Sequence, residues 1–339
     1  MAAKQVLSVS ARLLITESSQ GDGWAMSARQ PLPADIGRLL DTQGGVVLVS
    51  QLLAAGLTRR VCQRVTSSWT RLASGLYLER VPGFESAAWA GVLQAGPAGV
   101  VGSAAAAHLA GVLRDPPDDV VVWSTHHRSP LVVGPWQVRF RRGLRNGRGS
   151  PLRLPVEAGL IDLARDVDEI GAIDAVARAL ARGLTTPARI LDEVSSRQRV
   201  RHARAIRELC TASGGGIESG LEWLFQRDVL SAHGLPTPQR QVKTGVGRVD
   251  CRYDAFGLIV ELDGMRDHSD WSKDMIRDNE HVLRSNEITL RYGWGAATRQ
   301  ACLAAGQMGA ALRPRGWSGR VRECRRCAGR PLLEGRANA

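Results

Sequence analysis

The chain has few lysines, few aromatic residues and no long apolar stretch. Three of its 45 basic residues are lysines, and aromatic residues make up 5% of the 339 residues. No apolar run approaches the roughly 20 residues that a membrane-spanning helix needs. The first residues also lack the basic-then-apolar pattern of a secretory signal. We therefore expect no membrane partner and a cytoplasmic location.

Cysteine is sparse as well. The six cysteines are scattered and indicate no disulfide framework, which fits a reducing cytoplasm. Cys324 and Cys327 form a single Cys-x-x-Cys pair, and Cys302 is the only other cysteine in that end of the chain. A structural zinc site usually needs four ligands. Because no second pair exists, the sequence favours an incidental pair in a tail over zinc or redox chemistry.

Positive charge is abundant. The formal net charge is +12 and the isoelectric point is near 10.4. An excess of arginine favours polyanionic partners, chiefly nucleic acid. A genome rich in G and C would also favour arginine over lysine, so charge is a weak indicator without a motif. With 44% hydrophobic and 23% charged residues, the chain is typical of a globular protein of two or three domains.

Composition and breaks in periodicity predict five segments. Residues 1–30 read as a disordered tail, or as an extension upstream of a true start at Met26. The Ser/Gly-rich run that begins at Thr211 is the best boundary between domains. The expected segments are the tail, a winged helix-turn-helix at 31–82, a mixed and then helical middle region at 83–212, an α/β domain at 213–312 and an Arg-rich tail at 313–339.

Residues 31–82 have the order of a winged helix-turn-helix, in which the third helix enters the major groove of DNA. We expect Ser50 to cap the second helix and Thr58 to cap the third. The expected elements are helices at 35–41, 51–55 and 59–67, an apolar segment at 46–49, and wing strands at 69–72 and 75–78. The expected DNA-facing residues are Arg59, Arg60, Gln63 and Arg64 on the third helix and Arg71 on the wing. A protein-interaction module is the alternative.

The middle region carries two runs of arginine, one from Arg139 to Arg153 and one from Arg197 to Arg207. Each run is either a surface that contacts nucleic acid or an ordinary solvated face. Together with the preceding segment, this region resembles AbiEi-family antitoxins. That resemblance implies a DNA-binding domain fused to other modules.

The segment 248–264 is the most informative part of the sequence. Asp250 ends one short apolar segment, and after a turn a second apolar run leads to Glu261 and Asp263. Alternate residues of a strand share a face, so Glu261 and Asp263 point the same way and can meet Asp250 across a hairpin. Three carboxylates beside an apolar strand are costly unless a cation neutralises them. Oxygen ligands of this kind suit Mg²⁺ or Mn²⁺.

This segment resembles the core of the restriction-endonuclease-like (PD-(D/E)xK) nucleases, and most of all a domain of unknown function related to the very-short-patch-repair (Vsr) endonuclease. The resemblance covers about residues 215–300. The matching residues are Glu218, Val249-Asp250-Cys251, Glu261-Leu262-Asp263-Gly264, His268, Asp274, Arg277-Asp278 and Leu290-Arg291-Tyr292. Two departures stand out: Asp263 replaces the usual lysine, and one extra residue separates Gly264 from His268.

The resemblance implies an α/β/α core with a mixed sheet and a catalytic site. Asp250, Glu261 and Asp263 would bind the metal, Glu218 would complete the site with Glu222 as its rival, and His268 would act as acid/base or bind phosphate. Gln241 and Arg277 would contact nucleic acid, although Arg277 has an internal ion pair as its alternative.

The sequence thus predicts a Mg²⁺- or Mn²⁺-dependent DNA endonuclease with an N-terminal DNA-binding domain, of the kind used in repair or defence. The alternative is a non-catalytic DNA-binding regulator, the antitoxin of a toxin-antitoxin system, with a cognate toxin protein as partner.

Overall fold

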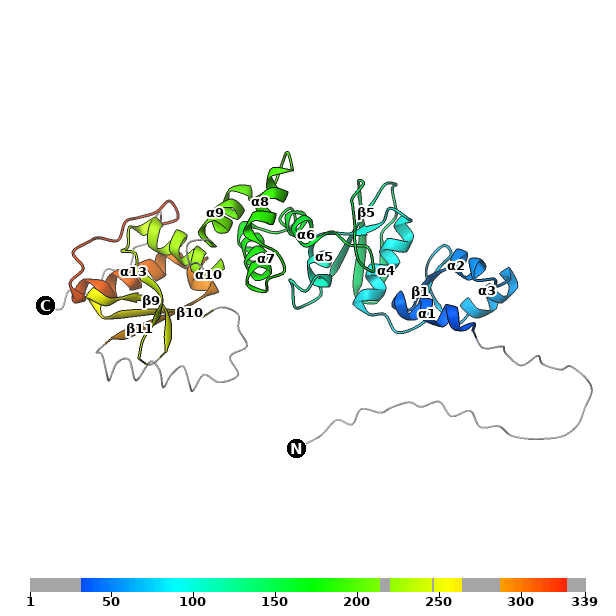
Figure 1. Ribbon diagram of the computed structural model, residues 1–339, viewed down its shortest axis with the longest axis horizontal. Coiled ribbons are helices and arrows are strands. Elements are labelled where there is room, and N and C mark those ends of the chain that lie inside the picture. The colour runs from blue at the N-terminus through cyan, green and yellow to red at the C-terminus, as the bar shows by residue number, and fades with distance from the viewer. Residues whose placement is uncertain (1–31, 214–219, 246, 264–286, 328–339) are drawn as a thin grey trace, which may run out of the picture.

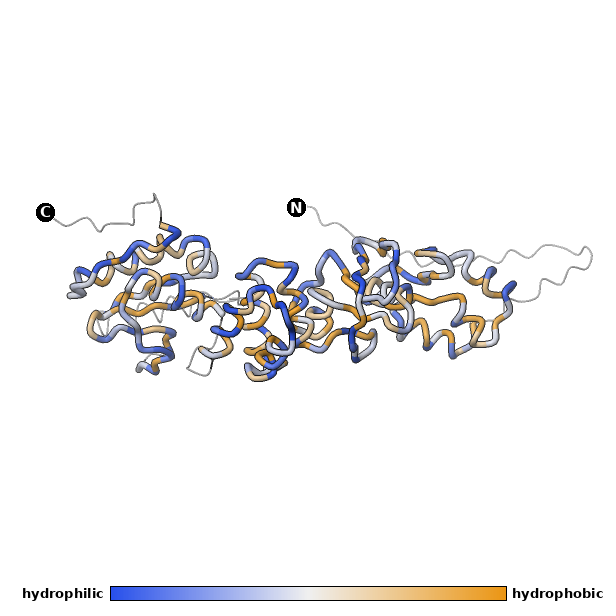
Figure 2. The backbone as a smooth tube through the Cα atoms, turned by 90° about the horizontal axis from the view of Figure 1, so that it is seen from above, coloured by the Kyte–Doolittle hydropathy of each residue, from blue (hydrophilic) through white to orange (hydrophobic). Residues whose placement is uncertain are grey.

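The computed structural model describes residues 32–213, 220–245, 247–263 and 287–327. Three predicted site residues, Glu218, His268 and Arg277, lie outside the described residues, as does the N-terminal segment 1–31. The chain is a mixed α/β protein whose elements follow one another along the long axis of the molecule (Figure 1). Hydrophobic segments recur along the whole of that length (Figure 2).

The N-terminal unit alternates helices and short strands. Its strands form an antiparallel sheet in the order β1-β3-β2. Its small core contains Ile36, Leu40, Leu52 and Cys62. The elements are α1 (Ala34–Thr42), β1 (Val46–Leu48), α2 (Val49–Ala54), α3 (Arg59–Thr66), β2 (Thr70–Ala73) and β3 (Leu76–Leu78).

One predicted helix cap in this unit is confirmed and the other is wrong. The hydroxyl of Thr58 accepts a hydrogen bond from the backbone N–H of Val61, as expected of a helix cap. Ser50, by contrast, lies inside α2, whose N-cap is Leu48. The side chain of Gln51 accepts from the Leu48 N–H at 2.9 Å. The helix starts earlier than expected because this glutamine replaces a serine cap.

A second sheet, in the order β4-β5-β7-β6, begins the middle region, and β5 and β7 run parallel within it. Helix α4 packs on these two strands at Gly91, where a Cβ would come within 2.6 Å of Val122. The elements are α4 (Phe84–Ala95), β4 (Val100–Val101), α5 (Ser103–Leu109), β5 (Asp119–Ser124), β6 (Leu131–Val133) and β7 (Trp136–Arg142).

Four helices complete the middle region, and Asp162 joins them to the sheet. The Asp162 side chain is 1% exposed, and its Oδ2 accepts from the Ser103 N–H at 3.0 Å and from Trp123 Nε1 at 2.9 Å. Both donors would be buried and unsatisfied without this carboxylate. The helices are α6 (Val156–Leu163), α7 (Glu169–Ala181), α8 (Pro187–Ser195) and α9 (Ala203–Ser213).

The C-terminal unit contains a mixed four-stranded sheet in the order β11-β10-β9-β8. The pair β10 and β11 is parallel, and the other pairs are antiparallel. One face is covered by helices, where the rings of Phe225 and Tyr292 lie 5.4 Å apart. The elements are α10 (Gly220–Leu224), the π-helix η1 (Phe225–Ser231), β8 (Gln239–Lys243), β9 (Arg248–Tyr253), η2 (Asp254–Phe256), β10 (Leu258–Asp263), β11 (Ile288–Gly293), α12 (Trp294–Ala297), α13 (Ala301–Leu312) and η3 (Arg313–Arg315).

Residues 313–327, expected to begin an Arg-rich tail, pack against this unit. Trp317 and Val321 contact its apolar core, and the Arg322 N–H donates to the His233 carbonyl at 2.8 Å. Cys327 is 1% exposed. In the part of the chain that the structure describes, no helix is both long and apolar enough to cross a membrane.

Replacing Asp162 with alanine is expected to destabilise the middle region by about 2–4 kcal/mol, because two buried donors lose their acceptor. Urea unfolding followed by tryptophan fluorescence measures this loss. The control is Asp162→Asn, whose amide oxygen can still accept from both Ser103 and Trp123. Equal stability of the alanine variant and the wild type would show that these hydrogen bonds contribute nothing.

Candidate active site and nucleic-acid interface

The two faces of β9 differ in character. Val249, Cys251 and Tyr253 are buried, so Asp250 and Arg252 occupy the opposite face. Val260 of β10 pairs with Cys251, and the next step along the two strands sets Glu261 opposite Asp250. Because strand residues alternate, Glu261 and Asp263 belong to the same face as Asp250. The predicted convergence of carboxylates on one face therefore follows from the register.

The Asp250 carboxylate lies where the hydrogen-bond ladder between β9 and β10 ends. The paired residues stop at Val260 and Cys251, and beyond them the Leu262 N–H donates to Asp250 Oδ2 at 2.8 Å. The carboxylate thus takes the place of a backbone acceptor. Glu261, the neighbouring acid, is buried with 6% of its surface exposed. The two side chains are placed by backbone geometry on both strands.

Asp263 is engaged by an arginine from the next strand. Arg291 donates to both of its oxygens, at 2.9 Å from Nε and 2.6 Å from Nη2. The parallel register places Arg291 directly beside Glu261. A bidentate pair of this kind is among the stronger charge-assisted interactions. The sequence matched Arg291 to a motif but gave it no site role, because only strand pairing brings it beside the two acids.

Glu222 and Gln241 form a further polar pair in the same unit. Glu222, on α10, is 8% exposed, and Gln241 Nε2 donates to its Oε1 at 3.1 Å. Arg248 Nε donates to Gln241 Oε1 at 2.5 Å. Gln241 has a φ of 50°, which is uncommon for a residue other than glycine and is found at functional sites. The sequence analysis gave Glu222 as the alternative to Glu218. Of these two residues, the structure describes Glu222.

The pKa of the Cys251 thiol is affected by several charged side chains. Burial raises the pKa of the Cys251 thiol to about 12; Arg240 lowers it, whereas the negative charges of Asp250, Glu222 and Glu261 raise it further. These acids come from α10, β9 and β10, and Cys251 itself faces the helices, on the side of the sheet opposite Asp250 and Glu261.

The three predicted metal ligands do not form a tight cluster. Among the described residues, Asp250, Glu261 and Asp263 are not part of any group of three or more ligand atoms within 4.8 Å of one another. The group that meets this limit is elsewhere in the same unit and comprises His233, Cys302, Cys324 and Cys327.

The predicted DNA-facing residues are exposed. Burial of Cys62 and Thr66 turns the opposite side of α3 outward, and there Arg60, Gln63 and Arg64 line an open hollow with Thr58 and Ser67. Arg59 and, on β2, Arg71 are exposed as well. Arg71 donates to the Ala73 carbonyl within its own strand at 3.4 Å.

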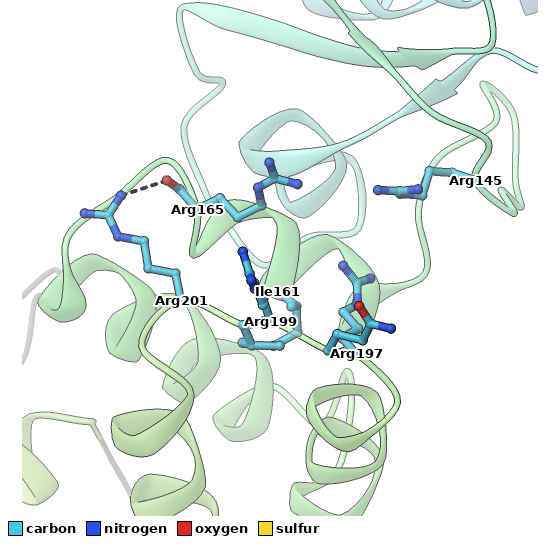
Figure 3. Close-up of a pocket in the computed structure, with 8 residues that line it drawn as sticks. Arg145, Ile161, Arg165, Arg197, Arg199 and Arg201 are labelled. Carbon is cyan, nitrogen blue, oxygen red and sulfur yellow. Dashed lines mark hydrogen bonds between the residues drawn. The ribbon is translucent and has the colours of Figure 1, made fainter.

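A basic pocket in the middle region joins the two arginine runs. It has a volume of about 880 Å³ and is lined by Arg145, Arg165, Arg197, Arg199 and Arg201, with Ile161, Gln198 and Val200 (Figure 3). The arginines surround the opening from separate segments, and Arg201 donates to the Arg165 carbonyl at 2.9 Å. The sequence could not predict this pocket because the two runs lie about fifty residues apart.

The electrostatics of the pocket suit an anion. Burial lowers the pKa of the Arg145 guanidinium, Asp162 raises it, and the positive charges of Arg197 and Arg165 lower it further. The guanidinium stacks 3.8 Å from the ring centre of Trp123, which fixes its direction. Like charges gathered in this way are stabilised by a bound phosphate or another anion.

No protein-family model matches the chain, and neither a curated protein nor a solved structure shows significant similarity to it.

The raised pKa of Cys251 predicts a loss of stability at high pH. The unfolded thiol ionises near pH 8.5, whereas the folded thiol stays protonated to about pH 12. The contribution of this thiol to the free energy of unfolding is therefore complete below pH 8.5. Ionisation of the unfolded thiol should then lower the free energy of unfolding by about 1–2 kcal/mol between pH 8 and pH 10. Urea unfolding at both pH values tests this. The control Cys251→Val cannot ionise, so a loss in it equal to that of the wild type would contradict the assignment.

Proposed function

We propose that the chain is a metal-dependent DNA endonuclease of the restriction-endonuclease-like class. The observation that carries the proposal is that the register of β9 and β10 places Asp250 and Glu261 on one face of adjacent strands. The mixed sheet β11-β10-β9-β8 supports the proposal, because the resemblance implies a mixed sheet.

The donor set of this site fits Mg²⁺ or Mn²⁺. Two carboxylates with the remaining positions held by water are a common ligand set for Mg²⁺. A bound ion would activate water and stabilise charge on the scissile phosphate. Asp250 is aligned by its hydrogen bond from Leu262, and burial restricts the conformations of Glu261.

Arg291 and Gln241 have positioning roles in this proposal. The guanidinium of Arg291 is held by Asp263 beside Glu261, where the lysine of related nucleases is missing. Its positive charge can attract a phosphate to the acidic face. Gln241 links Glu222 to Arg248 and can orient a water or a phosphate oxygen. The roles predicted for Glu218, His268 and Arg277 stay predictions.

DNA would be held along the length of the molecule. The helices and the β1-β3-β2 sheet of residues 32–78 have the order of a winged helix-turn-helix, whose third helix carries Arg59, Arg60, Gln63 and Arg64. The arginine pocket would bind backbone phosphate in the middle region. The net charge of +12 supports a polyanionic partner, and six free cysteines in the structure are compatible with the proposed cytoplasmic location.

A non-catalytic DNA-binding regulator is the second candidate. It is favoured by the Arg291 pair, which neutralises Asp263 without a metal. The carboxylates within the described residues also lack a compact trio. In this alternative the nuclease-like core is a scaffold, DNA binding remains, and a cognate toxin is the partner implied by the AbiEi-like region.

The decisive experiment measures nicking of supercoiled plasmid by the full chain with Mg²⁺ or Mn²⁺. We expect Asp250→Asn and Glu261→Gln each to lower the rate by about 100-fold or more, since each removes a charged metal ligand. Asp254→Asn is the matched control, because this exposed acid of the same unit lies in η2, beyond the end of β9, and pairs with Arg252. Absence of metal-dependent nicking, together with unchanged DNA binding by all proteins, would favour the regulator.

DNA binding is tested by its dependence on salt. Arg60→Ala with Arg64→Ala, and separately Arg197→Ala with Arg199→Ala, should weaken binding, and each lost phosphate contact should reduce the slope of log K against log salt by about 1. Fluorescence anisotropy with a labelled duplex measures both quantities. The controls are Arg38→Ala, on the exposed side of α1, and Arg204→Ala, at the start of α9. Equal losses in the controls would mean that only the net charge matters.

A further inference from the structure

Four potential metal ligands meet at the C-terminal end of the described chain. Nε2 of His233 and the Sγ atoms of Cys302, Cys324 and Cys327 all lie within 4.8 Å of one another. His233 follows η1, Cys302 belongs to α13, and the other two cysteines come from the extended segment after η3. His233 is fully buried and Cys327 nearly so. The set is independent of the acidic site.

The separations match those of a tetrahedral site. The Cys324 sulfur lies 3.7 Å from that of Cys302 and 3.6 Å from that of Cys327. The Cys327 sulfur lies 3.4 Å from Nε2 of His233. Zinc–sulfur bonds of about 2.3 Å in a tetrahedron place two sulfurs roughly 3.8 Å apart. The same separations are far longer than the roughly 2.05 Å of a disulfide bond, and all six cysteines are free.

The surroundings prepare the ligands for a metal. His233 Nδ1 lies 3.0 Å from the Val229 carbonyl. A proton on Nδ1 would be donated to that oxygen and leave the Nε2 lone pair directed at the three sulfurs. The backbone N–H of Arg326 donates to the Cys324 sulfur at 3.3 Å, and that of Cys324 to the Cys327 sulfur at 3.4 Å. Such donors stabilise thiolates, which are the form that binds metal.

We propose that His233, Cys302, Cys324 and Cys327 bind one structural Zn²⁺. Three sulfurs and one imidazole nitrogen in a closed tetrahedron are a zinc ligand set. Binding replaces the protons of the three thiols, which pass to the solvent. The resulting site carries one net negative charge. No position remains for a substrate, so the site is structural.

The zinc would explain why residues 313–327 follow the surface of the unit instead of extending from it. The segment lacks regular structure after η3, and its apolar contacts are few, with Trp317 and Val321 the main ones. A metal bound by two of its cysteines, by Cys302 of α13 and by His233 beyond η1 joins three parts of the chain that are distant in sequence. The arginines of this segment are thereby held against the nuclease-like unit.

The test measures metal content of the full, untagged chain purified without chelators under reducing conditions. Mass spectrometry of the dissolved metal should find about one zinc per chain in the wild type. In Cys302→Ser and Cys324→Ser it should find a loss of about fivefold or more. Cys62→Ser is the matched control, because this buried cysteine of α3 is remote from the cluster, and it should keep its zinc. Less than about a tenth of a zinc per chain in the wild type, iron in its place, or zinc retained in both cluster variants overturns the proposal.

A second measurement covers variants that fail to fold. Wild-type protein stripped of metal and titrated with Co²⁺ should develop the charge-transfer band of cobalt thiolates and the strong visible bands of tetrahedral cobalt, saturating at one ion per chain. Addition of Zn²⁺ should abolish both signals. Spectra typical of octahedral cobalt, or oxidation of the cysteines to a disulfide with no metal bound, would be evidence against the site. Neither measurement depends on nuclease activity.

Discussion

The pairing of β9 with β10 is the constraint on which the candidate active site depends. Burial of Val249, Cys251 and Tyr253 against the helices leaves one face for polar side chains, and the register then aligns Asp250 with Glu261. The Asp250 carboxylate also satisfies a backbone N–H where the ladder ends. One side chain therefore has a structural and a proposed chemical role. A shift of the register by one residue would turn the acids into the core, at a high cost in free energy.

Compensation of charge is a recurring feature of this molecule. At the acidic face, Arg291 neutralises Asp263, and Gln241 links Glu222 to Arg248. In the middle region, by contrast, arginines from three segments surround one pocket. Of the acids nearby, Asp162 accepts hydrogen bonds from Ser103 and Trp123, whereas Glu193 pairs with one of the pocket arginines, Arg197. The positive charge left over at the pocket is what an anionic backbone would neutralise.

The C-terminal unit also shows how a weakly apolar segment can become part of a fold. Residues 313–327 contribute few large side chains to the core. Little apolar surface is buried by this segment, and the proposed metal at the ligand cluster would stabilise it. The four ligands come together only in the folded chain, so the free energy of metal binding contributes to the free energy of folding. His233 lies close to 70 residues before the first of the three cysteines, so the helices must pack before the four ligands can meet.

The sequence by itself determined the order of the elements and much of their extent. The helices and strands of residues 32–78 lie within a few residues of their predicted positions, and Thr58 caps α3 as expected, because helix caps and alternation are local properties. The face shared by Asp250, Glu261 and Asp263 also follows from the two-residue period of a strand.

Only the tertiary structure decided which distant residues meet. The pair of Arg291 and Asp263 depends on a parallel register, and the link of Gln241 to Glu222 depends on the packing of a helix against a strand. The arginine pocket and the His233–Cys302–Cys324–Cys327 cluster each combine separate segments. The spacing of a single Cys-x-x-Cys carries no sign of the two other ligands, since loop closure brings them together in space and leaves no periodic pattern in the sequence.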